Sequence, residues 1–235
     1  VNKLISSNDR LIFAMDVSDC EQARKIVEEL GDAVSFYKLG LELMMTGDYF
    51  GLLDWMLSKE KKVFADLKFF DIPSTVGAAV HRLKNRGASF VTVHGNQSIM
   101  EAAAENKGDH LKVLAVTALT SLDRGDLDDL GFDCDVGDLV LSRARRALEA
   151  GCDGVISSGM EVAKLREQID NKLLVITPGI RPVDNKPSED QKRVVTVTQA
   201  FKNGADYIVV GRPIRDANNP RESAEAIQAS IADCF

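Results

Sequence analysis

The chain has 235 residues, of which 45% are hydrophobic and 28% are charged, as is typical of a soluble globular protein. Its formal net charge of -7 argues against a nucleic-acid-binding or membrane-surface protein, because both need an extended basic surface. A local basic pocket for an anionic small molecule is still compatible with this charge.

The cysteines and histidines give no sign of a metal or redox site. No two of the 4 cysteines are close enough in sequence for a metal knuckle or a CxxC motif, and the 3 histidines lack zinc spacing. The opening residues, VNKLISSNDRLIFAMD, lack the apolar core of a signal peptide, and no apolar run approaches the ~20 residues of a membrane helix. We therefore expect reduced thiols, no metal, no membrane partner and a cytoplasmic location.

Eight short apolar runs rich in β-branched residues recur along the chain and predict strands. In chain order they cover residues 10–16, 34–40, 62–68, 89–95, 111–118, 153–159, 173–179 and 206–212. Stretches with helical spacing lie between them, such as CEQARKIVEEL (20–30), STVGAAVHRLKNRG (74–87) and VLSRARRALEAG (140–151). Apolar strands that alternate with helices predict a parallel sheet covered by helices on its outside.

The junctions before three of these strands share one pattern, in NRGASFVTVHG, EAGCDGVISSG and KNGADYIVVGR. A helix end meets a glycine that reads as a helix stop, followed by a small residue, a polar residue and a strand. Eight such units predict a (β/α)8 TIM barrel that forms a single domain over residues 1–235. An open doubly wound sheet is the alternative, but it usually has fewer strands, and no GxGxxG follows the first strand.

Two connections are longer than the others, at residues 121–138 and 180–193. Both follow strands, on the face where barrels place their active sites. The second is polar and holds two prolines, which is typical of a lid that closes over a site. A tolerated surface loop is the alternative interpretation.

Charged residues stand at the ends of the first three predicted strands. Asp66 and Lys68 are two residues apart and so project to the same side of their strand. Asp16 ends the first strand, Lys38 lies near the end of the second, and Asp71 follows in the loop after the third. We expect these charges to converge at the mouth of the barrel. A purely structural network of ion pairs is the alternative, since each lysine offsets an acid.

The last two predicted strands end in segments suited to phosphate. TPGIRP carries Gly179 and Arg181, and VVGRPI carries Gly211 and Arg212. Barrels frequently bind phosphate in the loops after strands seven and eight, where backbone N–H groups and arginine side chains reach its oxygens. Two ordinary turns with surface arginines are the alternative.

Together these motifs resemble the orotidine 5′-phosphate decarboxylase family. The family pattern Asp-x-Lys-x-x-Asp-Ile-Pro stands here as Asp66, Lys68, Asp71, Ile72 and Pro73. YKLG, VTVHG, VTALTS, TPGIRP and VVGRPI follow in family order, so the resemblance runs from FAMD at residue 13 to VGRPI at 214. It implies decarboxylation of orotidine 5′-phosphate to UMP without a cofactor, and a homodimer that binds no nucleic acid.

The resemblance also implies a role for each site residue. Lys68 would protonate C6 of the pyrimidine within a charged array that includes Asp66, Asp71 and Lys38. The substrate contacts would come from Asp16 and Lys38 at the ribose, Thr120 at the base, and Arg181, Gln191, Gly211 and Arg212 at the phosphate. Thr75 and Asp71 would reach the site of the neighbouring subunit.

The chain departs from the family pattern at two positions near the array. The family often has a polar residue where Phe70 stands and Asn where Ser74 stands. Neither side chain takes part in proton transfer in the implied reaction. We therefore expect these differences to tune the activity without abolishing it.

Two rival functions remain on the same barrel. Metal-dependent sugar-phosphate decarboxylases and synthases share the Asp-x-Lys-x-x-Asp segment, but they tend to have Ala-Gly in place of Ile72 and Pro73 and a metal-binding glutamate in place of Lys38. A lysine repels Mg²⁺. A non-catalytic nucleotide-binding barrel would be free to lose one of the array residues, and all are present.

Overall fold

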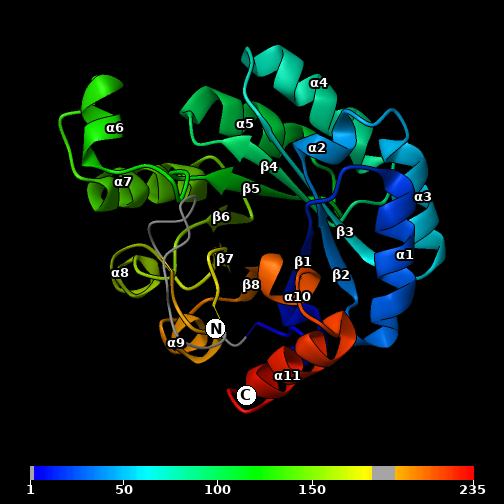
Figure 1. The fold of residues 1–235 in the computed structure, drawn as a ribbon. Helices are drawn as coiled ribbons and strands as arrows, with labels where there is room; N and C mark the ends of the chain where they lie inside the picture. The colour runs from blue at the N-terminus through cyan, green and yellow to red at the C-terminus, as the bar shows by residue number, and fades with distance from the viewer. Residues whose placement is uncertain (1–2, 182–193) are drawn as a thin grey trace.

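A computed structural model describes residues 3–181 and 194–235 and contains the expected closed barrel (Figure 1). Eight strands pair in parallel in chain order, and the last pairs with the first. They are β1 (Leu11–Met15), β2 (Phe36–Leu39), β3 (Lys62–Phe69), β4 (Phe90–His94), β5 (Lys112–Val116), β6 (Gly154–Ile156), β7 (Leu174–Thr177) and β8 (Tyr207–Val210). The prediction of eight strands is therefore confirmed; seven strands are shorter than the predicted apolar runs, and β3 extends one residue beyond its run.

Helices surround the barrel on its outside (Figure 1). Those in the described residues are α1 (Cys20–Leu30), α2 (Leu41–Met44), α3 (Tyr49–Ser58), α4 (Pro73–Lys84), α5 (Gln97–Asn106), α6 (Arg124–Asp129), α7 (Val136–Glu149), α8 (Val162–Gln168), α9 (Val197–Lys202), α10 (Arg212–Arg215) and α11 (Pro220–Ala232). Two 3₁₀ turns, Ser7–Arg10 and Gly31–Ala33, precede β1 and β2. In the described parts of the chain, no helix has the length and apolar character needed to cross a bilayer.

The connection at 121–138 is not a plain loop. It contains α6, which begins after a capping box in which Asp123 and Asp126 each accept the other's backbone N–H. The connection at 180–193 can be followed only at its first two residues, so the predicted lid lies almost wholly outside the described residues.

The hydrophobic core has two layers. Alternate strand residues point outward and pack under the helices, while the others fill the barrel itself. Four inward rings fill the interior of the barrel with centroids 4.9–6.0 Å apart, from Phe36, Phe64, Phe90 and Tyr207. The same alternation continues toward the carboxyl ends of the strands, so the next inward positions after Phe36 and Phe64 are Lys38 and Asp66.

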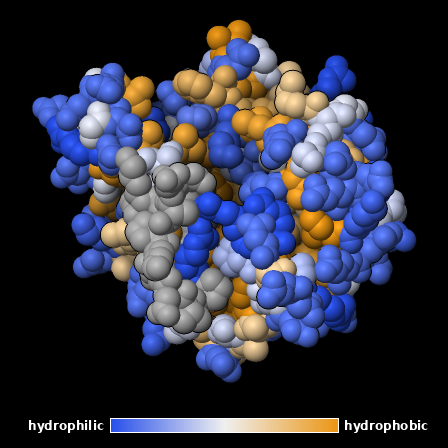
Figure 2. All heavy atoms as spheres, in the orientation of Figure 1, coloured by the Kyte–Doolittle hydropathy of each residue, from blue (hydrophilic) through white to orange (hydrophobic). Residues whose placement is uncertain are grey.

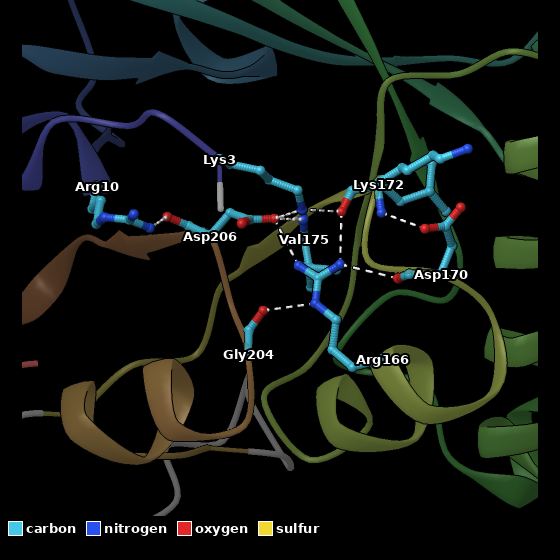
Figure 3. Close-up of polar contacts among 9 residues, drawn as sticks. Lys3, Arg10, Arg166, Asp170, Lys172, Val175, Gly204 and Asp206 are labelled. Atoms are coloured by element: carbon cyan, nitrogen blue, oxygen red, sulfur yellow. Dashed lines mark hydrogen bonds and ion pairs between the residues drawn. The ribbon is translucent and has the colours of Figure 1, made fainter. Parts of the chain in front are cut away.

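The repeated junctions have a structural role at the opposite end of the barrel. Their glycines, Gly87, Gly151 and Gly204, all have positive φ, as expected of helix stops. The polar residue two positions after each glycine forms a hydrogen bond with the start of a neighbouring strand. Asp206 Oδ2 accepts from Val175 N at 2.9 Å and also binds the cationic side chains of Lys3 and Arg166 (Figure 3).

Candidate active site

A cavity of about 610 Å³ opens at the carboxyl ends of the strands. This volume lies in the range that holds small-molecule ligands. Its wall combines charged residues at the carboxyl ends of β1, β2 and β3 with loop residues that follow β5, β7 and β8. The lining includes Asp16, Lys38, Asp66, Lys68, Thr120, Ser121, Gly179, Arg181, Gly211, Arg212 and Arg215. Most of the residues predicted from the sequence therefore face one space.

The four strand-end charges form a continuous chain with alternating sign. Lys38 Nζ lies 3.1 Å from Asp16 Oδ1 and 3.4 Å from Asp66 Oδ2, and Lys68 Nζ lies 2.8 Å from the same Asp66 oxygen. The convergence predicted for these four residues is confirmed. We call Asp16, Lys38, Asp66 and Lys68 the charged array.

The two inner members of the charged array are buried as ions. Burial alone would raise the pKa of Asp66, but Lys38 and Lys68 outweigh it and leave that pKa below its ordinary value. Burial would lower the pKa of Lys38, but Asp66 and Asp16 outweigh it and leave that pKa above its ordinary value. Both groups are therefore charged near neutral pH, and the pKa of each depends on the charge of the other.

The backbone of β3 is distorted where it presents Lys68. The register between β3 and β4 shifts between Ala65 and Phe69, as at a β-bulge, and Lys68 has a φ of 47°. A left-handed conformation is uncommon for a residue with a side chain and is often found at functional sites. The Lys68 side chain still faces the cavity, as strand alternation predicts, but it does so from a distorted backbone.

Thr92 on β4 holds this distorted segment in place. Its hydroxyl donates to Asp66 Oδ1 at 2.8 Å and accepts from the Lys68 backbone N–H at 3.0 Å. The side chain is fully buried. Sequence reasoning missed Thr92, although its inward direction follows from alternation with Phe90.

The opposite side of the cavity carries the segments expected to bind phosphate. Gly179, Arg181, Gly211 and Arg212 all line it, and Thr120 faces it from the loop after β5. A Cβ atom at Gly211 would lie 3.3 Å from Ala14 Cβ, so the chain after β8 passes close to β1. Glycine thus allows this close approach, which a side chain would crowd.

Three predicted site residues are not placed in the cavity of a single chain. Asp71 is exposed and accepts from the Ile72 backbone N–H at 2.6 Å, and Thr75 is exposed on α4. Neither lines the cavity. Gln191 lies outside the described residues. Phe70, where the family often has a polar residue, is exposed, and its ring stacks on His94 with centroids 4.6 Å apart.

Arg215 is a cavity residue that sequence reasoning missed. It stands three positions after Arg212 on α10, a spacing that places both side chains on neighbouring parts of one helix turn. The spacing of three residues from Arg212 is the sequence signal that indicates its position near the cavity. Across residues 3–181 and 194–235, no group of three or more His, Cys, Asp or Glu side chains is arranged to hold a metal ion.

Comparison with known proteins agrees with this geometry. Residues 9–227 match the family described as "Orotidine 5′-phosphate decarboxylase / HUMPS family". The orotidine 5′-phosphate decarboxylase of Methylococcus capsulatus is 67% identical over 234 residues, which cover 100% of this chain and 96% of that protein. The enzyme of the same name from Stenotrophomonas maltophilia is 48% identical over 232 residues, covering 98% of this chain and 96% of that protein.

A solved structure agrees in fold as well. The crystal structure of orotidine 5′-phosphate decarboxylase from Lactobacillus acidophilus superposes with a TM-score of 0.84 at 35% identity. The match covers 95% of this chain and 99% of that one. The whole barrel, including the ends of the strands that form the cavity, is therefore shared.

Proposed function

The chain belongs to the orotidine 5′-phosphate decarboxylase / HUMPS family, and on that basis we propose that it is a carboxy-lyase that converts orotidine 5′-phosphate to UMP. The observation that carries the proposal is the charged array, which shares one cavity with Gly211 and Arg212. Cationic groups at one end suit a phosphate, and a lysine held by a carboxylate at the other suits a developing carbanion.

The chemical step uses the side chains of the charged array and needs no cofactor. The bond between C6 and the carboxylate carbon breaks, CO₂ leaves, and the electron pair stays at C6. Lys68 stabilises that negative charge and then gives its proton to C6, which completes UMP. Asp66 fixes the ammonium group through its contact of 2.8 Å, and solvent restores the proton to Lys68 after product formation.

The remaining residues bind the parts of the nucleotide that do not react. Asp16 and Lys38 hold the ribose, and Thr120 contacts the base. Arg181, Gly211, Arg212 and Gln191 bind the phosphate. Binding energy from the phosphate, far from C6, is available to orient the pyrimidine against Lys68.

Lys38 argues against a metal-dependent sugar-phosphate enzyme on the same barrel. Its ammonium group already contacts the carboxylates of Asp16 and Asp66, so a divalent cation bound to either acid would meet the like charge of Lys38. A non-catalytic nucleotide-binding barrel would not need the strained backbone at Lys68 or its contact with Asp66.

The active protein is a cytoplasmic homodimer in which each chain lends Asp71 and Thr75 to the site of its partner. Both residues are exposed, and Asp71 stands between two exposed apolar side chains, Phe70 at 65% and Ile72 at 64%. A further exposed apolar side chain, Met45 at 84%, follows α2. Figure 2 shows hydrophobic surface around α2 and α4 at the edge of this face. Burial of such a surface against a second copy would remove it from water. We expect no nucleic-acid partner, because the net charge of -7 disfavours one.

One assay tests the proposed function against its rivals. The purified protein is mixed with orotidine 5′-phosphate and excess EDTA, and the pyrimidine absorbance is followed. We expect turnover to UMP at a rate that chelation does not change. Absence of turnover would contradict the proposal, and turnover that appears only after Mg²⁺ is added would contradict a step that needs no cofactor.

A further inference from the structure

Arg215 lines the cavity but has no role in the proposed function described above. It lies on α10, which follows β8 with Gly211 as its N-cap. Its Nη1 donates to the backbone carbonyl of Asp16 at 2.7 Å, across 199 positions of sequence. This bond ties α10 to the backbone that directly follows β1.

The other nitrogens of Arg215 contact a neighbouring carboxylate. Nε lies 2.7 Å from Asp216 Oδ1 and Nη2 lies 3.1 Å from Asp216 Oδ2, which is a bidentate pair. This pairing fixes the plane of the guanidinium and offsets its charge. The side chain is therefore arranged to hold the backbone of Asp16, and a substrate phosphate would find its charge already paired.

Asp16 is the outer end of the charged array. Its side chain is 51% exposed, so packing alone does not determine where its carboxylate lies. Its contact with Lys38 connects it to Asp66 and, through Asp66, to Lys68. A shift of the Asp16 backbone would therefore alter the position of Lys38 and the field at Lys68.

Two glycines leave room for this connection. A Cβ atom at Gly211 would lie 3.6 Å from Asp16 Oδ2, and one at Gly40 would lie 3.4 Å from Lys38 Nζ. The backbone before α10 and the backbone after β2 thus both approach the pair formed by Asp16 and Lys38. Through Gly211, the segment that carries Arg212 and Arg215 lies directly against the charged array.

We propose that Arg215 is a positioning residue for decarboxylation: by holding the Asp16 carbonyl, it fixes Asp16 and Lys38 and so the alignment of Lys68. This inference rests on the proposed function. It predicts that Arg215→Met lowers kcat/KM for orotidine 5′-phosphate about tenfold, as for the loss of one hydrogen bond to a charged group. Arg215→Lys, which keeps a cationic donor, should recover most of that loss.

A double-mutant cycle with Asp16→Ala tests whether Arg215 acts through Asp16. Once the Asp16 side chain is removed, its backbone position no longer matters to Lys38. Adding Arg215→Met to Asp16→Ala should then change kcat/KM by less than about twofold. A second tenfold loss would overturn the proposal, because it would mean that Arg215 acts on the phosphate or on α10 independently of Asp16.

A matched control and a second variant complete the experiment. Arg221 on α11 also joins a backbone carbonyl, that of Leu30, to two carboxylates, but it does not line the cavity. Arg221→Met should leave kcat/KM unchanged in both backgrounds, and thermal unfolding verifies that each variant is folded. If Arg215→Met does not fold, the cycle is measured with Arg215→Gln under the same criteria. The unsubstituted protein is assayed first, so failure of the proposed function is seen separately as absence of turnover.

Discussion

Asp66 is the residue on which the charged array depends. It is almost fully buried, and its carboxylate contacts Lys38, Lys68 and the hydroxyl of Thr92. A buried carboxylate is tolerated only when cations and donors surround it. The members of the charged array therefore stabilise one another, and removal of one charge leaves its neighbour buried without its ion-pair partner.

The low pKa of Asp66 predicts a pH-dependent contribution to stability. Burial raises this pKa, but Lys38 and Lys68 outweigh burial and lower it below the ordinary value of 3.8. A lowered carboxyl pKa stabilises the folded state above the unfolded pKa, and this stabilisation is lost as pH falls through the folded value. We expect Asp66→Asn to reduce the free energy of unfolding by about 2 kcal/mol at pH 7.

The same difference should shrink as the medium is acidified below pH 3.8, because the Asp66 carboxyl then becomes protonated in the parent protein too. Urea denaturation followed by circular dichroism across this range measures it. A difference that stays constant or grows on acidification would show that Asp66 is not stabilised as a carboxylate.

Substitution of Arg212 distinguishes a role in phosphate binding from a purely structural role. If its guanidinium binds the phosphate, Arg212→Ala should weaken UMP binding by ~1.5–3 kcal/mol, or roughly ten- to a hundredfold. Binding of uridine, which lacks the phosphate, should change little. Calorimetric titration of both ligands into both proteins measures this, and equal losses for the two ligands would assign Arg212 a structural role.

At the scale of elements, strand β3 and its neighbour β4 together determine where Lys68 lies. Alternation along β3 correctly predicts that Asp66 and Lys68 face the mouth. It does not predict the register shift or the positive φ of Lys68, because both depend on the hydrogen bonds that Thr92 makes from β4.

Thr92→Val tests this support. Valine has nearly the same shape but leaves Asp66 Oδ1 and the Lys68 N–H without the hydroxyl. We expect kcat to fall about tenfold, in line with ~1–3 kcal/mol for unpaired buried polar groups. Thr92→Ser keeps the hydroxyl and serves as the control in steady-state kinetics. Equal rates for Thr92→Val and the parent would mean that β3 holds Lys68 without help from β4.

Some helices and strands can be predicted from the sequence and others cannot. The strands are predictable because apolar β-branched runs must be buried, and the regular apolar spacing of residues 20–30 predicts α1 at its observed bounds. Helix α6 was missed because RGDLDD has no apolar stripe and is stabilised mainly by its capping box. Thr92 and Arg215 were missed for a related reason, since each acts on a backbone group that only the folded chain brings near.

At the scale of the whole molecule, the barrel leaves apolar side chains exposed beside its charged mouth. Phe70 and Ile72 follow β3, and Leu41 and Met45 follow β2, so both sets lie next to the elements that carry the charged array. Asp71 stands between Phe70 and Ile72. A two-fold dimer across this surface would place each Asp71 near the partner's cavity, which is the arrangement proposed above.

Subunit exchange tests the shared site. Lys68→Ala and Asp71→Ala should each be inactive, but a mixed dimer would collect both lesions in one site and leave the other intact. With equal amounts and random exchange, half the dimers are mixed, so activity should recover to about a quarter of the parent value. Mass spectrometry of tagged subunits verifies that exchange occurred.

A second mixture provides the control. Lys68 and Asp66 lie on the same strand, so Lys68→Ala mixed with Asp66→Asn leaves every site with one lesion and should not recover. Failure of the first mixture to recover, despite verified exchange, would place Asp71 in the site of its own chain or in none.

In the proposed reaction, Lys68 is held by Asp66 in the charged array and delivers the proton that completes decarboxylation. The most direct measurement compares the parent protein with Lys68→Ala at saturating orotidine 5′-phosphate, with UMP titration and thermal unfolding to verify an intact site. We expect the Lys68→Ala protein to stay folded, to bind UMP and to lose decarboxylation. Turnover at the parent rate by a folded Lys68→Ala protein would contradict this expectation.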